Sequence, residues 1–177
     1  MILKFKFSKL FRLSSRSKSK CSKHKERNLT KGRCFESEYI LEERVIGRGG
    51  FGTVHKAIRK SDDLEVAVKI VPKDHRLVPL EKTACSENVP VEVVMLRQVS
   101  DVPGVVKLLD YFETPSSYLI VMEMFTSCDL FDLISQCGHL TEEVAQEIFA
   151  QIVESLMDCK SRQVLHGDIK VGSFLSN

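Results

Sequence analysis

Residues 47–57 read Gly47-Arg48-Gly49-Gly50-Phe51-Gly52-Thr53-Val54-His55-Lys56-Ala57, and this stretch decides the fold. Glycines at 47, 49 and 52 let a backbone approach phosphate oxygens without an intervening side chain. The same spacing opens dinucleotide-binding βαβ units, so the glycines alone are a weak signal. A dinucleotide loop opens a helix, whereas residues 53–58 have the composition of a strand. We therefore predict a strand, a glycine turn and a second strand.

The flanking sequence extends these strands into an antiparallel meander. Tyr39–Ile46 precedes the glycines, a polar turn occupies residues 60–63, and Glu65–Val71 forms the next strand. The alternation in residues 66–69 is expected to bury Ala67 on one face and to bring Lys69 within reach of bound phosphates. A surface lysine at the end of a strand is the alternative interpretation.

A helix is expected over residues 89–99. Pro90 lies near its start, and apolar residues recur at 91, 94, 95 and 99. Glu92 lies on the side that should face the sheet, where it could pair with Lys69. Glu92 also fits an ordinary first-turn acid that favours the helix dipole. Glu87 is a rival partner for Lys69, but it precedes the proline.

The motifs together resemble the signature set of eukaryotic protein kinases. They occur in the expected order: the glycine stretch, Val66-Ala67-Val68-Lys69, Glu92, and later His166-Gly167-Asp168. Three runs are similar more narrowly to the Pim group of serine/threonine kinases, namely residues 89–96, 103–112 and 129–134. The resemblance covers residues 37–170.

The resemblance implies an α+β, protein-kinase-like fold. Its parts would be an antiparallel β-sheet N-lobe with one αC helix, and the first helices of an incomplete helical C-lobe. We expect a basic disordered tail at residues 1–36 and a nucleotide-binding N-lobe at residues 37–122. The hinge and the truncated start of the C-lobe would occupy residues 123–177.

The resemblance also implies an ATP site at the junction of the lobes. Val54 would cover the adenine, Met122 would be the gatekeeper behind it, and Asp129 would meet the ribose or simply stabilise a helix N-terminus. Pim kinases have a proline and an extra residue in the hinge; this chain has neither, so the backbone of Glu123 and Phe125 is expected to make two ordinary hydrogen bonds to the base. The expected nucleotide contacts are Gly47, Gly49, Gly52, Val54, Ala67, Lys69, Glu92, Glu123, Phe125 and Asp129.

By the same resemblance, Asp168 is the catalytic aspartate that accepts the proton of a protein hydroxyl, and Lys170 steadies the γ-phosphate. Mg²⁺ is expected for the family, but Ser173 replaces its asparagine ligand and residues 1–177 contain no Asp-Phe-Gly motif. No metal ligand is therefore assigned. Gly167 replaces the arginine that pairs with a phosphorylated activation loop. Since transfer depends on charge neutralisation by the metal, we expect a serine/threonine kinase by family with little or no transfer by this chain. The alternative is a truncated pseudokinase that only binds nucleotide or a partner.

A long amphipathic helix is expected after Thr141, its N-cap. In a kinase its apolar face packs on later helices of the C-lobe. Left bare, such a face would favour aggregation, capture by a chaperone or pairing with a kinase partner. The face consists of Val144, Ile148, Phe149, Ile152, Val153 and Leu156.

The charge is divided unevenly along the chain. Residues 1–33 carry 12 Lys and Arg against one acid, Glu26, which leaves −9 on residues 34–177 because the whole chain carries +2. Residues 1–13 mix apolar and basic side chains, as in a segment that contacts an anionic membrane surface, an organelle presequence or a solvated basic arm with a nuclear-localisation patch. Attraction to nucleic acid would be generic, so no specific nucleic-acid partner is expected.

Six single cysteines without a Cys-x-x-Cys pair argue against a disulfide framework or a zinc site. No apolar run reaches the length of a membrane span. A cytoplasmic or nuclear protein is the interpretation that fits.

Overall fold

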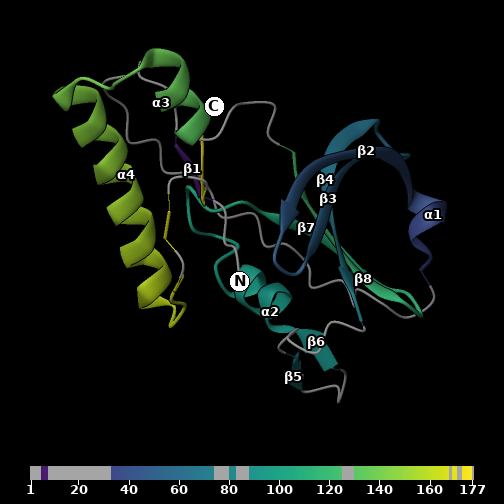
Figure 1. The fold of residues 1–177 in the computed structure, drawn as a ribbon. Coiled ribbons are helices and arrows are strands. Elements are labelled where there is room, and N and C mark those ends of the chain that lie inside the picture. The colour runs from purple at the N-terminus through teal and green to yellow at the C-terminus, as the bar shows by residue number, and fades with distance from the viewer. Residues whose placement is uncertain are drawn as a thin grey trace.

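The computed structural model describes residues 5–7, 33–73, 80–82, 88–124, 130–167, 169–170 and 173–176. A lobe built on a β-sheet lies beside a lobe built on helices, and helix α2 lies between them (Figure 1). This arrangement is the α+β, kinase-like division that the sequence predicts.

The main sheet has five antiparallel strands in the order β2-β3-β4-β8-β7. The predicted meander of β2, β3 and β4 is confirmed, and β8 inserts between β4 and β7. These segments form strands because they are rich in Val and Ile and are bounded by polar turns. The strands are β2 (Tyr39–Gly49), β3 (Gly52–Arg59), β4 (Leu64–Pro72), β7 (Leu108–Glu113) and β8 (Ser117–Glu123).

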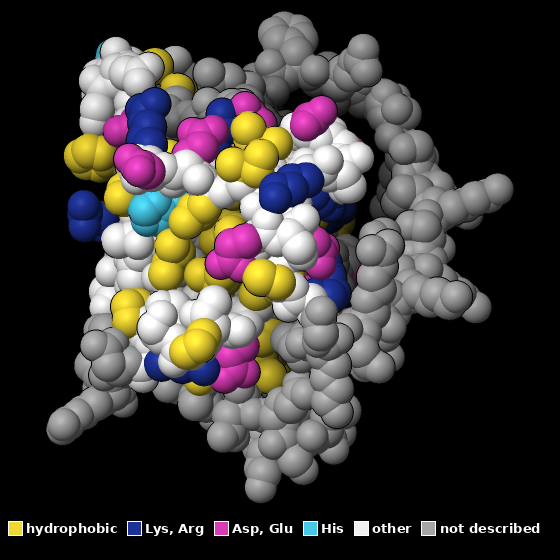
Figure 2. All heavy atoms as spheres, turned by 90° about the vertical axis from the view of Figure 1, so that its right-hand side faces the viewer, with side chains coloured by type: hydrophobic (Ala, Val, Ile, Leu, Met, Phe, Trp, Pro, Cys, Tyr) yellow, Lys and Arg dark blue, Asp and Glu magenta, His cyan; other side chains and the backbone are white. Residues whose placement is uncertain are grey.

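The outer face of the sheet is covered by a short helix, α1 (Phe35–Glu38). Phe35 stacks on Tyr39 with ring centroids 5.3 Å apart, and both rings meet Phe112 edge to face. Residues 33–36 therefore belong to the folded lobe, which corrects the predicted boundary of the tail at residue 36. Phe35 is buried in the aromatic core of this face with Tyr39 and Phe112, as a residue of a solvated tail would not be. On this side of the molecule, hydrophobic side chains and charges of both signs are interspersed (Figure 2).

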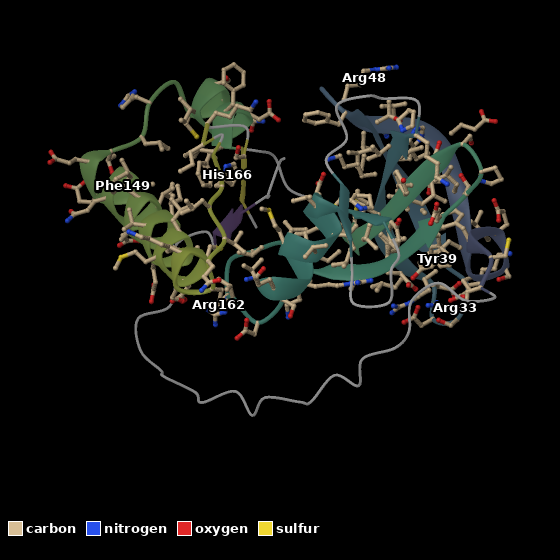
Figure 3. All side chains as sticks on the ribbon, turned by 90° about the horizontal axis from the view of Figure 1, so that it is seen from below. Arg33, Tyr39, Arg48, Phe149, Arg162 and His166 are labelled. Carbon is tan, nitrogen blue, oxygen red and sulfur yellow. The ribbon has the colours of Figure 1, made fainter. Side chains whose placement is uncertain are left out.

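Arg33 fastens α1 to the sheet. Its guanidinium donates to both carboxylate oxygens of Asp110 on β7, at 3.1 and 2.7 Å, and also pairs with Glu38. These hydrogen bonds, to Glu38 first, raise the pKa of Arg33 above its ordinary value. The Tyr39 hydroxyl donates to the same Asp110, and burial raises the pKa of Tyr39 to about 12. We call Arg33, Glu38, Tyr39 and Asp110 the Arg33 clasp; Figure 3 shows Arg33 and Tyr39 close together.

The inner face of the sheet packs on helix α2 (Val91–Gln98). The helix begins two residues later than predicted, because residues 88–90 form strand β6 (Asn88–Pro90), which pairs with β5 (Leu80–Lys82). Val93, Leu96 and Val99 are fully buried, whereas the predicted core positions 91, 94 and 95 are half-buried. The predicted face is therefore confirmed in part: Val99 is buried, and Val94 and Met95 pack against the core, but Val93 and Leu96 at its centre were not predicted.

Two helices form the other lobe: α3 (Leu130–Cys137) and α4 (Glu142–Ser161). Thr141 caps α4 as predicted, accepting a hydrogen bond from the Val144 amide. The covered stripe of α4 is narrower than the predicted apolar face, because Phe149 points outward and is 66% exposed (Figure 3). The apolar residues of α4 that pack on the core are Val144, Ile148, Ile152, Leu156 and Cys159.

A second, two-stranded sheet joins the beginning and the end of the sequence. Strand β1 (Phe5–Phe7) pairs in parallel with β9 (Phe174–Ser176), in the register Phe5 with Phe174. Residues 5–7 were predicted to be part of a disordered tail, and their pairing corrects that prediction. Its pairing partner, β9, follows the predicted catalytic loop, where no strand was predicted.

Polar contacts tie α4 to the turn that follows α2. Arg162 forms a bidentate pair with Asp101, at 2.9 and 2.7 Å, which lowers the pKa of that carboxyl. Gln98 donates to the Arg162 carbonyl, and Ser155 donates to the Pro103 carbonyl at 3.3 Å. The end of α2 is thereby fixed to the chain segment that leads into residues 166–170.

Among the described helices, none combines the length and the apolar character that a membrane crossing requires. The described thiols of Cys34, Cys137 and Cys159 are free, and burial raises the pKa of Cys159.

Candidate functional site

The β2–β3 hairpin carries the glycines and forms one wall of the site. Gly47 lies opposite Val54 and Gly49 opposite Gly52, so Gly50 and Phe51 make the turn. A Cβ on Gly52 would overlap the backbone carbonyl oxygen of Ile70, whereas a Cβ on Gly50 would meet nothing within 4 Å. Packing inside the chain thus explains Gly52, and the space around Gly50 is open to a ligand.

Three neighbouring strands present predicted nucleotide contacts on one face of the sheet. Val54 pairs with Lys69, and Ala67 pairs with Met122. Residues directly opposite in antiparallel strands project to the same side, so all four side chains share a face. Ala67 is only half-buried, because Val66 and Val68 point into the aromatic core of the opposite face and are fully buried. The prediction that Ala67 is buried was wrong, and the half-buried position leaves it able to touch a ligand.

Lys69 and Glu92 form a buried ion pair. The Lys69 Nζ lies 2.5 Å from Glu92 Oε2, and the two side chains are 6% and 11% exposed. Glu92 reaches the lysine because α2 turns this residue toward the sheet together with Val93 and Leu96. The structure therefore brings together the two residues that the sequence analysis paired, across 23 positions of the chain.

The hinge end of β8 uses Glu123 to hold the preceding loop. Its amide donates to the Lys107 carbonyl at 3.0 Å, and its side chain accepts from the Lys107 amide at 2.7 Å. The amide of Glu123 is thus engaged within the protein, a contact that no sequence pattern indicated. The other two predicted contacts of this region, Phe125 and Asp129, lie outside the described residues, as does Glu87, the rival partner of Lys69.

The predicted catalytic loop follows α4. His166 is buried and lies beside the helical lobe (Figure 3), and Lys170 is exposed. Asp168 lies outside the described residues, so its position relative to Lys69 stays a prediction. Ser173 is completely buried, and its amide donates to the Lys170 carbonyl at 2.8 Å. Within the described part of the chain, no three His, Cys, Asp or Glu side chains gather as a metal-binding group.

One face of the sheet is bordered by three features: the glycine hairpin, the buried pair of Lys69 and Glu92, and the end of β8 that leads into the hinge. Residues 40–177 match the protein kinase domain family. The chain belongs to the protein kinase family. The fold of this kinase domain is also similar to the crystal structure of Rad53 1–466 in complex with AMP-PNP, with a TM-score of 0.64 and 26% identity. That match covers 78% of this chain and 34% of the Rad53 chain.

Among curated proteins, the kinase domain is similar to serine/threonine kinases. It is 39% identical over 137 residues to serine/threonine-protein kinase prk-2 of Caenorhabditis elegans, covering 77% of this chain and 30% of the relative. It is 37% identical over 146 residues to serine/threonine-protein kinase pim-2 of Danio rerio, covering 77% of this chain and 46% of the relative. The chain therefore spans less than half the length of these relatives.

Proposed function

We propose that this chain binds ATP in the site between the glycine hairpin and Lys69, as part of a Pim-like serine/threonine protein kinase. The observation that carries the proposal is the buried pair of Lys69 and Glu92, 2.5 Å apart, on the face that also presents Val54 and Ala67. A lysine held at this depth by one carboxylate is oriented to meet phosphate oxygens. Similarity to the zebrafish pim-2 kinase supports the Pim-like assignment.

The described residues fit a nucleotide. The open space at Gly50 leaves the hairpin backbone accessible to phosphate groups, and the hairpin glycines add no side chain there. The half-buried Ala67 and its partner Met122 would lie against the base. At the hinge, Glu123 would contribute its carbonyl oxygen, since its amide donates to Lys107.

The same residues do not fit Mg²⁺. Ser173 stands where a family member has an asparagine ligand, and it is completely buried and held in a turn with Lys170. Of the expected site acids, Asp129 and Asp168 lie outside the described residues, and among the described residues no three His, Cys, Asp or Glu side chains gather. We therefore propose that the 177 residues by themselves bind ATP without transferring its γ-phosphate to a serine or threonine hydroxyl.

A binding experiment with two readouts tests this proposal. The melting temperature (Tm) of purified residues 1–177 is measured over a roughly thousandfold range of ATP concentration, with and without Mg²⁺. In parallel, the protein is incubated with labelled ATP and a basic serine peptide. We expect a rise in Tm that saturates with ATP, no labelled peptide, and loss of the Tm rise in Lys69→Met. Mg²⁺-dependent labelling that disappears in Lys69→Met and Asp168→Asn would instead establish a working kinase.

The second candidate function is an interaction module without nucleotide. The observation that favours it is the outward-facing row on α4, where Phe149 and Met157 are 66% and 67% exposed. An absent Tm rise with ATP, in a chain that is folded by circular dichroism, would support this candidate against the first. For either function, the free thiols of the described cysteines support the proposal of a reducing compartment, the cytoplasm or the nucleus.

A further inference from the structure

The sheet of β1 and β9 lies in the helical lobe and joins two segments that are far apart in the sequence. The Cα atoms of β1 come within 8 Å of those of α4, and β9 makes the same approach to α3. Phe174 on β9 is 4% exposed and belongs to the core that contains Leu130, Ile148 and Cys159. Strand β1 is thus placed along the edge of the core of this lobe (Figure 1).

A parallel pair of two three-residue strands cannot be stable alone. Isolated two-stranded sheets are marginal in water, and parallel pairing is weaker per residue than antiparallel pairing. The pair must therefore draw its stability from the helices beside it. The dependence is mutual, because without β1 the backbone groups of β9 lose their pairing partners.

Arg33, the first described residue after β1, is anchored on the sheet lobe. Residues 8–32, with nine Lys and Arg, connect β1 to Arg33. Arg33 is clamped on Asp110 at the outer face of the sheet lobe, away from the helices (Figure 3). A 25-residue connection reaches at most roughly 85 Å when fully extended, so both anchors can be occupied at once.

We propose that Phe5–Phe7 is a built-in cover of the helical lobe, which pairs with β9 and protects the edge of this lobe. The segment that covers this edge is the chain's own first strand, so α4 and β9 do not need a second protein to shield it. The outward row of Phe149 and Met157 lies apart from this function and stays exposed. The proposal does not depend on nucleotide binding.

Hydrogen exchange on the full chain tests the cover. One variant replaces the strand by Phe5→Gly, Lys6→Ser and Phe7→Gly, and the matched control makes the same kind of change, with the same loss of one lysine, at Ser17→Gly, Lys18→Ser and Ser19→Gly. We expect amides of α4 and β9 to exchange roughly tenfold faster in the strand variant and unchanged in the control. Amides of β3 and β4 should keep their protection in both, which shows that the sheet lobe is folded.

Two further measurements complete the test. Lys6→Pro alone, a milder change that keeps both phenylalanines, should give a smaller increase of exchange at the same amides. Light scattering should find wild type to be a monomer. Equal exchange in wild type, strand variant and control would overturn the proposal. A wild-type dimer that the strand variant converts to monomers would also overturn it, because the strand would then cover a second copy.

Discussion

Replacing Glu92 with leucine removes the carboxylate that holds Lys69 and leaves an ammonium buried without its partner. At the observed separation of 2.5 Å, an effective dielectric constant near 20 gives a gross attraction of roughly 7 kcal/mol. Desolvation of both charges offsets much of this gain. We expect Glu92→Leu to lower the free energy of unfolding by about 3 kcal/mol, the low end for breaking a buried pair, because Glu92 keeps 11% exposure.

The double variant distinguishes this cause from a simple loss of packing. With Lys69→Met and Glu92→Leu together no unpaired charge remains, so the double variant should lose less stability than Glu92→Leu alone. Urea unfolding followed by circular dichroism at 25 °C measures the three differences. Lys56 and Glu65 are the matched control, since their charged atoms are also 2.5 Å apart but the side chains are 26% and 47% exposed. No measurable coupling is expected for the control pair. Equal coupling in the two pairs would refute the argument that burial strengthens the Lys69–Glu92 pair.

Three further predictions concern substitutions in the sheet lobe. Gly52→Ala should lower the free energy of unfolding by about 2 kcal/mol, because its Cβ overlaps a backbone carbonyl, whereas Gly50→Ala, with open space, should stay within about 0.5 kcal/mol; similar urea midpoints for the two would contradict the packing argument. Arg33→Gln should cost about 2 kcal/mol by leaving a buried carboxylate without its guanidinium, while Lys56→Gln at an exposed pair should leave the midpoint unchanged. Tyr39 has a raised pKa of about 12, so the unfolded chain loses this proton first and stability should fall between pH 10 and 12; Tyr39→Phe should fall less over that range, and parallel curves would exclude Tyr39 as a cause.

The nucleotide lobe is predictable from the sequence because its signals are local. Glycines followed by a strand composition fix the β2–β3 hairpin, and the alternation around Lys69 fixes which face carries the lysine. The pairing with Glu92 follows from helix periodicity, although the predicted buried face of α2 was confirmed only in part. Val93 and Leu96 were left out of that face, since a helix rich in valine offers apolar residues on every side.

The Arg33 clasp on the sheet lobe and strand β1 on the helical lobe could not be predicted from local sequence signals. The Arg33 clasp joins residues 77 positions apart, and Arg33 is indistinguishable by composition from the basic residues before it. The only local hint was the spacing of Phe35 and Tyr39 beside acids. Strand β1 offers three residues with the alternation of a strand, but its partner lies 169 positions away in register. Tertiary contact decides such short strands.

Covalent labelling with an acyl-phosphate derivative of ATP tests the central claim most directly, because the probe transfers its acyl group to a lysine amine that lies beside the bound phosphates. Wild-type residues 1–177 are labelled, digested and analysed by mass spectrometry, with and without excess ATP. The account predicts that Lys69 is labelled and that excess ATP suppresses this labelling, while labelling of the exposed Lys56 is not suppressed. Labelling of Lys69 that persists in excess ATP, or suppression at Lys56 instead, would contradict the assignment of the nucleotide site.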